Sequence, residues 1–312
     1  MAKTRDIQRR IKSISSTKRI TRAMEMVEAA KMRKAVAAVL ASRTYANLSW
    51  ETLLNIARSS ENTISHPLLE TRSEIKKQAL ILITANRGLC GGFNSAIIAE
   101  AKRYIAGFED ITDVIVVGRK GEVIRNTAHV AAAFPKEETG ITVASVSAVA
   151  TLGIDGFTNK TYDRVLVAYT DFINAAKQVP RVKQLLPVQT DVADGSLGIF
   201  SENDKVGLSQ EFVEGKSKEH LQSGKFSHEY IFEPSRQMVL DQVVPRLVTV
   251  QLYQALLEST ASEHSARMAA MHQATKAASD LVMELTLFYN KARQAAITAE
   301  IAEITAGVAA VT

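Results

Sequence analysis

The chain is poor in the residues that build covalent or metal-based sites. Its 312 residues include one cysteine, Cys90, which excludes an intramolecular disulfide, a cysteine-rich zinc site and a CxxC redox pair. Aromatic residues make up only 6%, and no apolar run reaches the roughly 18 residues that a membrane-spanning helix needs. Hydrophobic residues still account for 46% and charged residues for 23%, which indicates a globular chain with a real core and excludes wholesale disorder.

Positive charge is concentrated near the N-terminus. Residues 1–34 contain eleven Lys and Arg against three acids, a local charge of +8, whereas the whole chain carries +5. Basic residues precede any apolar run, so we expect no signal peptide. A basic end on a near-neutral body predicts an acidic partner: nucleic acid, an anionic membrane surface or an acidic protein patch. Charge alone does not choose among them.

Proline and glycine, the strongest breakers of helices, are missing from both ends. Neither occurs before Pro67 or between Pro245 and Gly307. We therefore predict long helices within residues 1–60 and residues 234–312.

The N-terminal helix carries a narrow apolar stripe that another element must cover. Its members are Ile7, Ile11, Ile14, Ile20, Met24, Val27, Ala30, Ala37 and Leu40. The C-terminal segment offers a cover, a ridge of Val244, Val248, Leu252 and Leu256 flanked by Leu240, Val243 and Leu247. Fifteen alanines between residues 261 and 310 keep that helix thin. An antiparallel coiled coil of the two ends is the favoured arrangement, and an ordinary helical bundle is the alternative.

The middle of the chain, residues 76–233, has the rhythm of an α/β domain. Short runs rich in branched residues, typical of strands, occupy residues 79–84, 113–117 and 164–169; a helix-like segment covers 94–106, and a further segment lies around 143–152. This alternation predicts a parallel sheet with helices on its faces, a Rossmann-like domain. Extra edge strands are expected at residues 178–190 and 228–233, separated by a surface excursion over 191–227.

No motif in the chain predicts an active site. The turn from Arg87 to Asn94 lacks both GxGxxG spacing and the Gly-Lys-Ser/Thr of a phosphate loop, so we interpret it as a tight turn packed near a helix. The six histidines show no metal-ligand spacing. Cys90 could be a nucleophile, but a small buried side chain between glycine-rich neighbours is favoured. We therefore predict no catalytic, cofactor-binding or metal-binding residues.

Three segments, in order, resemble the gamma subunit of F-type ATP synthases. They are residues 20–33 (ITRAMEMVEAAKMR), residues 87–94 (RGLCGGFN) and residues 289–304 (YNKARQAAITAEIAEI). Together they span nearly the whole chain, with 191–227 the poorest match.

The resemblance implies a non-catalytic rotor shaft. In that family the coiled coil enters a hexamer of alternating alpha and beta subunits, which hold the catalytic sites, while the α/β domain stands beside the epsilon subunit on the membrane-embedded c-ring. It implies coupling of proton-driven c-ring rotation to ATP synthesis or hydrolysis, with no cofactor and no nucleic acid. Contact with the membrane is expected only through partners, at the cytoplasmic face of a bacterial inner membrane.

The resemblance also implies coupling and partner contacts at individual positions. Met24, Arg293, Gln294, Thr298, Glu300 and Glu303 match coupling positions; Lys31, Arg33 and Lys34 match basic contacts to beta; Tyr230, Phe232 and Glu233 match a foot on the c-ring. Arg87 is a further candidate contact. The regulatory disulfide of chloroplast members is excluded, because it needs two cysteines.

Two functions from other classes stay open at this stage. A coiled-coil protein binding nucleic acid through residues 3–34 would show salt-sensitive binding to DNA or RNA. A cofactor-binding enzyme built on the central domain would bind a nucleotide, although the missing fingerprint argues against it.

Overall fold

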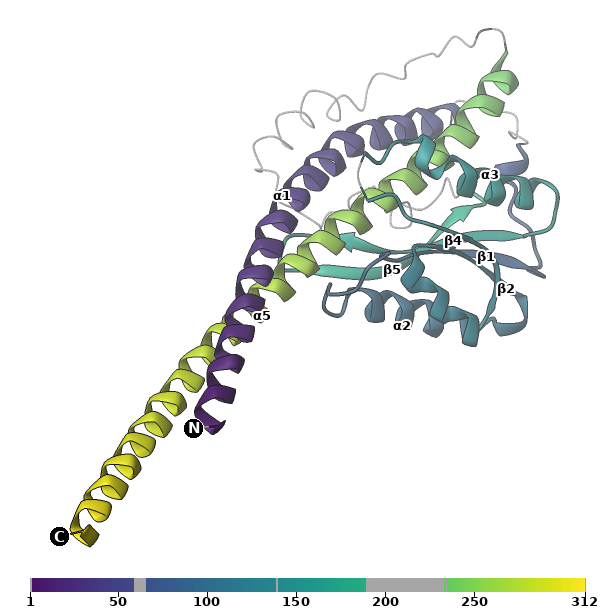
Figure 1. Cartoon of the computed structure of the whole chain (residues 1–312). Helices are drawn as coiled ribbons and strands as arrows, with labels where there is room; N and C mark the ends of the chain where they lie inside the picture. Colours follow the sequence, from purple (N-terminus) through teal and green to yellow (C-terminus); the bar gives the residue numbers. More distant parts are fainter. Residues whose placement is uncertain (1, 59–65, 139, 189–232, 234, 312) are drawn as a thin grey trace. The chain divides into compact units, whose positions relative to one another are not determined.

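The computed structural model describes residues 2–58, 66–138, 140–188, 233 and 235–311 (Figure 1). The chain forms two compact units. The paired-helix unit consists of Met1–Ala30 and Arg267–Thr312, and the α/β unit of Lys31–Ala266. Helices α1 (Ala2–Arg58) and α5 (Arg236–Val311) each contribute to both units. Of the expected edge strand at 228–233 only residue 233 is described, and the expected surface excursion over 191–227 lies outside the described residues.

A five-stranded sheet organises the α/β unit. The strands are β1 (Gln78–Ile83), β2 (Thr112–Val117), β3 (His129–Phe134), β4 (Arg164–Phe172) and β5 (Gln178–Leu186). Their order is β3-β2-β1-β4-β5, and only β5, paired with β4, runs antiparallel. The predicted parallel sheet is confirmed, and the run 178–190 does supply an edge strand.

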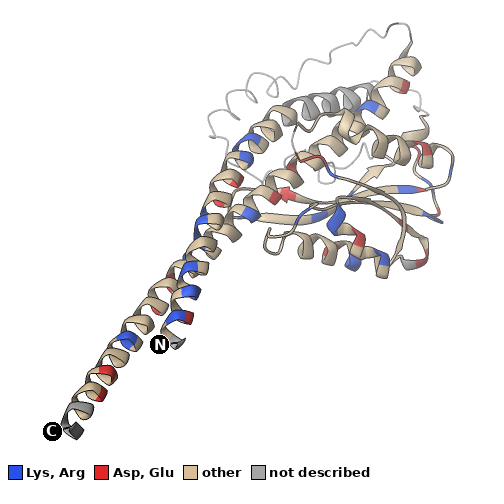
Figure 2. Cartoon of the chain, in the orientation of Figure 1, with Lys and Arg blue, Asp and Glu red and all other residues tan. Residues whose placement is uncertain are grey.

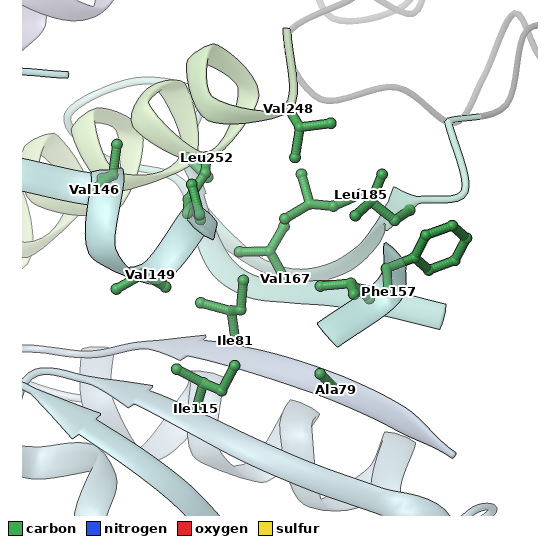
Figure 3. Packing of buried hydrophobic residues seen from close by; sticks show 14 of the residues in the cluster. Ala79, Ile81, Ile115, Val146, Val149, Phe157, Val167, Leu185, Val248 and Leu252 are labelled. Carbon is green, nitrogen blue, oxygen red and sulfur yellow. The ribbon is translucent and has the colours of Figure 1, made fainter. Parts of the chain in front are cut away.

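Helices cover both faces of this sheet, as expected for parallel strands without an alternating pattern. Every residue of β1 and β2 is buried. On one face, odd-numbered β1 residues such as Ile81 pack with α3 (Ala144–Thr158) and α5 (Figure 3). On the other face, Leu80 and Leu82 pack with α2 (Phe93–Ile105). Each fully buried branched side chain contributes about 1.5–3 kcal/mol, so the stability of this unit comes chiefly from these two layers.

The C-terminal ridge is buried, but its predicted role was wrong. Leu240, Val244, Val248, Leu252 and Leu256 are all at most 2% exposed. They pack in the core cluster that contains the sheet and α3, not as the cover of the N-terminal stripe. The i+4 spacing predicted a buried face correctly, whereas spacing alone carries no information about which neighbour buries it.

Strand β3 and its approach escaped the sequence analysis. The strand reads HVAAAF, lies at an edge of the sheet and alternates between exposed and half-buried residues. Three alanines give little strand propensity, so the pattern is weak. After the Gly118 turn the chain forms a 3-10 segment, η3 (Arg119–Asn126). The segment around 143–152 belongs to helix α3.

Glycine is required where β2 turns into η3. Gly118 has φ +100°, and a Cβ there would overlap the Thr84 carbonyl group. Thr84 in turn donates a hydrogen bond from Oγ1 to the Gly118 carbonyl, 2.9 Å away. This close approach joins the carboxyl ends of β1 and β2.

Candidate interaction surface on the paired helices

The two helices of the paired-helix unit run antiparallel and are joined by polar contacts. Lys18 Nζ donates to Ser279 Oγ at 2.9 Å, the Thr21 and Thr275 hydroxyls hydrogen-bond at 2.8 Å, and Arg267 Nη1 lies 3.4 Å from Glu28 Oε2. The residue numbers of the partners on α5 decrease as those on α1 increase, so the two helices run antiparallel. The predicted coiled coil of the chain ends is therefore confirmed.

Buried polar side chains form the seam of this unit. Glu28 and Arg267 are 7% and 6% exposed, and Thr21 and Thr275 are 9% and 8% exposed. A buried ion pair adds little net stability over apolar packing, but removing one partner leaves an uncompensated charge. Such a seam therefore disfavours any register that separates these partners.

The predicted apolar stripe was wrong in its middle section. Ile20 is 58% and Val27 52% exposed, and Ala30 and Ala37 are exposed as well. The seam instead follows the 3.5-residue spacing that begins at the isoleucines, through Ile7, Ile11, Ile14, Lys18, Thr21, Glu25 and Glu28, all buried or half-buried. The spacing was visible in the sequence, but its polar members hid it from a search for apolar residues.

Helix α5 extends beyond the first residue of α1. Because Lys18 lies opposite Ser279, the first residue of α1 falls opposite about residue 295 in an antiparallel pair. Every residue from 297 to 306 is exposed, consistent with a single helix beyond that point (Figure 1).

Large apolar side chains lie on the outside of this helix. The side chains are 48–71% exposed, and Leu287 is the most exposed; the residues are Met283, Leu287, Ile297, Ile301 and Ile304. Their heptad spacing matches that of the seam but is displaced by one or two residues, which puts them on the opposite side of the helix. An apolar stripe exposed in this way is a candidate surface for contact with another protein.

The predicted C-terminal contact residues lie together on this end. Arg293, Gln294, Thr298, Glu300 and Glu303 are all exposed, and Gln294 falls in the outer stripe between Leu287 and Ile297. Met24, in the same unit, is half-buried.

The other predicted residues lie elsewhere. In the α/β unit, Lys31 is half-buried, Arg33 and Lys34 are exposed, and Arg87 pairs with Glu138 at 3.1 Å. Glu233 is exposed, and Tyr230 and Phe232 lie outside the described residues.

The first two dozen residues of α1 present a basic surface (Figure 2). Its exposed members are Arg5, Arg9, Arg10, Lys12, Arg19 and Arg22. Such a surface attracts acidic groups at a distance that salt limits to about 10 Å.

The crevice in which α/β sheets usually take ligands is filled by α5. In this sheet the strand order reverses between β1 and β4, and ligands bind at the carboxyl ends of strands at such a point. There Ser262 donates to the Thr170 carbonyl at 3.2 Å, and Ala266 packs against Ala85, Cys90 and Phe93. The turn from Arg87 to Asn94 thus packs on a helix, as the tight-turn interpretation predicted, and Cys90 is buried.

A polar cluster at the amino ends of the strands surrounds Asp113. Its carboxylate lies 2.8 Å from Lys77 Nζ and 2.9 Å from His129 Nδ1, and accepts a hydrogen bond from Tyr162 at 3.0 Å. Burial raises the pKa of Asp113, but these hydrogen bonds and the Lys77 charge outweigh burial and lower it below the ordinary value. Burial and the Asp113 charge raise the pKa of Tyr162 to about 12. The cluster is a clamp between strands.

Arg72 extends this clamp to helix α3. Its guanidinium donates to Asp163 at 2.7 Å and to the carbonyls of Tyr162 and Phe157, both at 2.8 Å, while lying 4.6 Å from the centre of the Phe157 ring. Burial raises the pKa of Asp163, but the hydrogen bonds from Arg72 and two backbone amides lower it overall.

Within the described ranges, no helix combines the length and apolar character needed to cross a membrane. Over the same residues, His, Cys, Asp and Glu side chains form no group of three or more suited to a metal ion.

Comparison with known proteins identifies the family. The model of the ATP synthase family matches residues 3–311. The ATP synthase gamma chain of Herpetosiphon aurantiacus is 41% identical, with 99% of each chain covered. The central stalk and c-ring structure of the Tetrahymena thermophila mitochondrial ATP synthase contains a chain that is 25% identical with a TM-score of 0.55, covering 82% of this chain and 99% of that one. A chain of the Euglena gracilis mitochondrial ATP synthase shares the fold at 19% identity and a TM-score of 0.63, over 99% and 95%. The chain therefore belongs to the family of ATP synthase gamma chains.

Proposed function

We propose that this chain is the non-catalytic rotor of an F-type ATP synthase. It couples proton-driven rotation of a c-ring to ATP synthesis or hydrolysis in a hexamer of alpha and beta subunits. Each elementary charge that crosses 100 mV releases about 2.3 kcal/mol, so several charges must turn one shaft without slippage before an ATP is made.

One observation carries this proposal: the outer apolar stripe on the unaccompanied end of α5. Ile297, Ile301 and Ile304 are large apolar side chains, yet they are 48%, 59% and 68% exposed. A surrounding sleeve of partner subunits would cover them from any side, and a thin, alanine-rich helix can turn inside such a sleeve.

The proposal assigns the remaining predicted contacts to partners. Met24, Arg293, Gln294, Thr298, Glu300 and Glu303 would meet the hexamer, with Lys31, Arg33, Lys34 and Arg87 as further contacts. Tyr230, Phe232 and Glu233 would form the foot on the c-ring, beside epsilon. The basic surface of α1 supports attraction to acidic loops of beta, which is screened and therefore exchangeable.

Catalysis is assigned to the beta subunits. The α5 segment that fills the sheet crevice supports this assignment, because it takes the place that a nucleotide would need. In the proposed complex, the chain would be held at the cytoplasmic face of a bacterial inner membrane only through its partner subunits.

Reconstitution with matched alpha and beta subunits tests the proposal. We expect the chain to co-elute with them in gel filtration and to raise their ATPase activity. Replacing Ile297, Ile301 and Ile304 together by Ser should weaken both effects, whereas Glu74→Ala with Lys76→Ala, an exposed ion pair of the α/β unit, should change neither. Absence of co-elution for the unaltered chain would exclude the rotor function.

A further inference from the structure

Helix α5 is fastened to the carboxyl end of the sheet by one short stretch. Between Ser262 and Ala266 it contacts the carboxyl end of β4 and the segments that follow β3 and β1. Ser262 reaches the end of β4, and Ser265 Oγ donates to the Ala175 carbonyl in the turn after β4 at 2.7 Å. Small side chains at these positions let the helix backbone come close to the loops.

The third contact of this stretch is a buried ion pair. Lys136 Nζ donates to Glu263 Oε2 at 2.6 Å, and the two side chains are only 2% and 9% exposed. Lys136 comes two residues after β3 ends, so the pair links the far edge of the sheet to α5. Charges so well hidden from water are weakly screened, which makes their attraction strong.

Asn86 holds the lysine in place through its backbone. The Asn86 side chain donates from Nδ2 to the Lys136 carbonyl at 2.6 Å and accepts from the Lys136 amide at 3.2 Å. The same Oδ1 accepts from the Arg119 amide, 3.4 Å away. The loops after β1, β2 and β3 are thereby joined into one rigid base under the ammonium group of Lys136.

We propose that Lys136 and Glu263 form the joint through which the sheet turns α5, a positioning role that rests on the rotor function proposed above. Torque applied to the α/β unit would tend to slide or twist α5 over the sheet. Apolar packing is non-directional and resists such sliding weakly, because one apolar contact replaces another. The ion pair resists it, because any displacement separates two charges that have no water to compensate them.

The experiment uses the complete synthase in inverted membrane vesicles, with ATP hydrolysis and ATP-driven proton pumping measured on the same preparation. The decisive variant replaces Lys136 and Glu263 together by Met, which preserves volume and leaves no buried charge unpaired. We expect ATP hydrolysis within about 2-fold of the unaltered enzyme and a pumping-to-hydrolysis ratio at least about 3-fold lower.

Two further variants separate a joint from a merely structural pair. The exchanged pair, Lys136→Glu with Glu263→Lys, should restore most of the ratio. Arg103→Ala removes an exposed ion pair with Glu100 on α2 and serves as the control, with no expected change.

If the double-Met enzyme had the same ratio of proton pumping to ATP hydrolysis as the unaltered enzyme, the proposed role of the ion pair would be wrong. It would also be wrong if neither double variant assembled, because the pair would then serve folding alone. If the unaltered chain itself supports no pumping with matched partners, the proposed rotor function fails instead.

Discussion

Two stretches of one helix reverse the usual distribution of polarity. In the α/β unit, every α5 residue from 254 to 265 is buried, although this stretch includes Gln254, Glu258 and Glu263. In the paired-helix unit, residues 297–306 are all exposed, although they include three isoleucines. The polar side chains of the buried stretch, Ser259 excepted, have partners within the chain, whereas the exposed apolar stretch is the part that the proposed function assigns to contact with other subunits. Burial here follows tertiary surroundings, not the hydropathy of the segment.

The buried stretch is tolerated because its polar side chains, with the exception of the Ser259 hydroxyl, have partners. Gln254 donates to Glu258 at 2.8 Å, and Thr260 Oγ1 donates to the Leu256 carbonyl at 2.7 Å. Unpaired, each buried group of this kind would cost about 1–3 kcal/mol.

The largest expected effect is a difference in the free energy of unfolding between substitutions at a buried and at an exposed isoleucine. Ile81→Ala, at 1% exposure in β1, should lower the free energy of unfolding by about 3 kcal/mol, through lost burial and the cavity left behind. Ile301→Ala, at 59% exposure, should change it by less than about 0.5 kcal/mol. Urea unfolding of the isolated chain measures both. Equal losses would contradict the distinction.

Breaking the buried ion pair of the paired-helix unit should come next. Arg267→Met removes the guanidinium that lies 3.4 Å from the buried Glu28 carboxylate and should cost about 2–3 kcal/mol. Glu28→Leu combined with Arg267→Met should regain most of that loss. The comparison is made by urea unfolding, followed by the circular dichroism of the helices. A double variant no more stable than the single one would show that an uncompensated buried charge is not the main cause of the loss.

Removing the arginine clamp should have a smaller effect. Arg72→Met deletes the hydrogen bonds to Asp163 and to two carbonyls and should cost about 1–3 kcal/mol. Arg103→Ala, on the exposed side of α2, is the matched control and should be nearly neutral. Thermal unfolding distinguishes the two.

The smallest expected effect is a pH dependence at His66. Burial lowers the pKa of His66, partly opposed by Asp241, and Nδ1 accepts a hydrogen bond from the Leu68 amide at 3.1 Å. The unfolded chain therefore binds a proton more readily, so the stability due to this group is present above pH 6.5 and is lost as the pH falls toward the folded-state pKa. His66→Asn keeps an acceptor without a charge, and should flatten the change in melting temperature between pH 7 and 5. If the melting temperature of the variant changed with pH as much as that of the unaltered chain, groups other than His66 would cause the acid sensitivity.

Much of the fold was predictable because its strands are strongly apolar. The runs ALILIT, DVIVV and, after its half-buried Arg164, RVLVAY are buried on both faces, and no other element type explains them as well. Strand β3 was missed because an edge strand needs little apolar character. The seam was misassigned because hydropathy does not reveal that Thr21 and Glu28 are buried against polar partners.

The candidate site was less accessible to sequence reasoning. The residues of the C-terminal end could be named by resemblance, but nothing in their types shows that α5 continues beyond α1. The joint at Lys136 and Glu263 joins residues 127 positions apart, and no local pattern predicts such a pair.

The central claim is that the chain turns inside its partners. The most direct measurement attaches a probe to Lys76→Cys in the α/β unit, with alpha and beta subunits immobilised; Cys90 is buried, and the Lys76 side chain is 77% exposed. We predict stepwise, unidirectional rotation of the probe when ATP is added. A probe that stays still while ATP is hydrolysed would contradict the account.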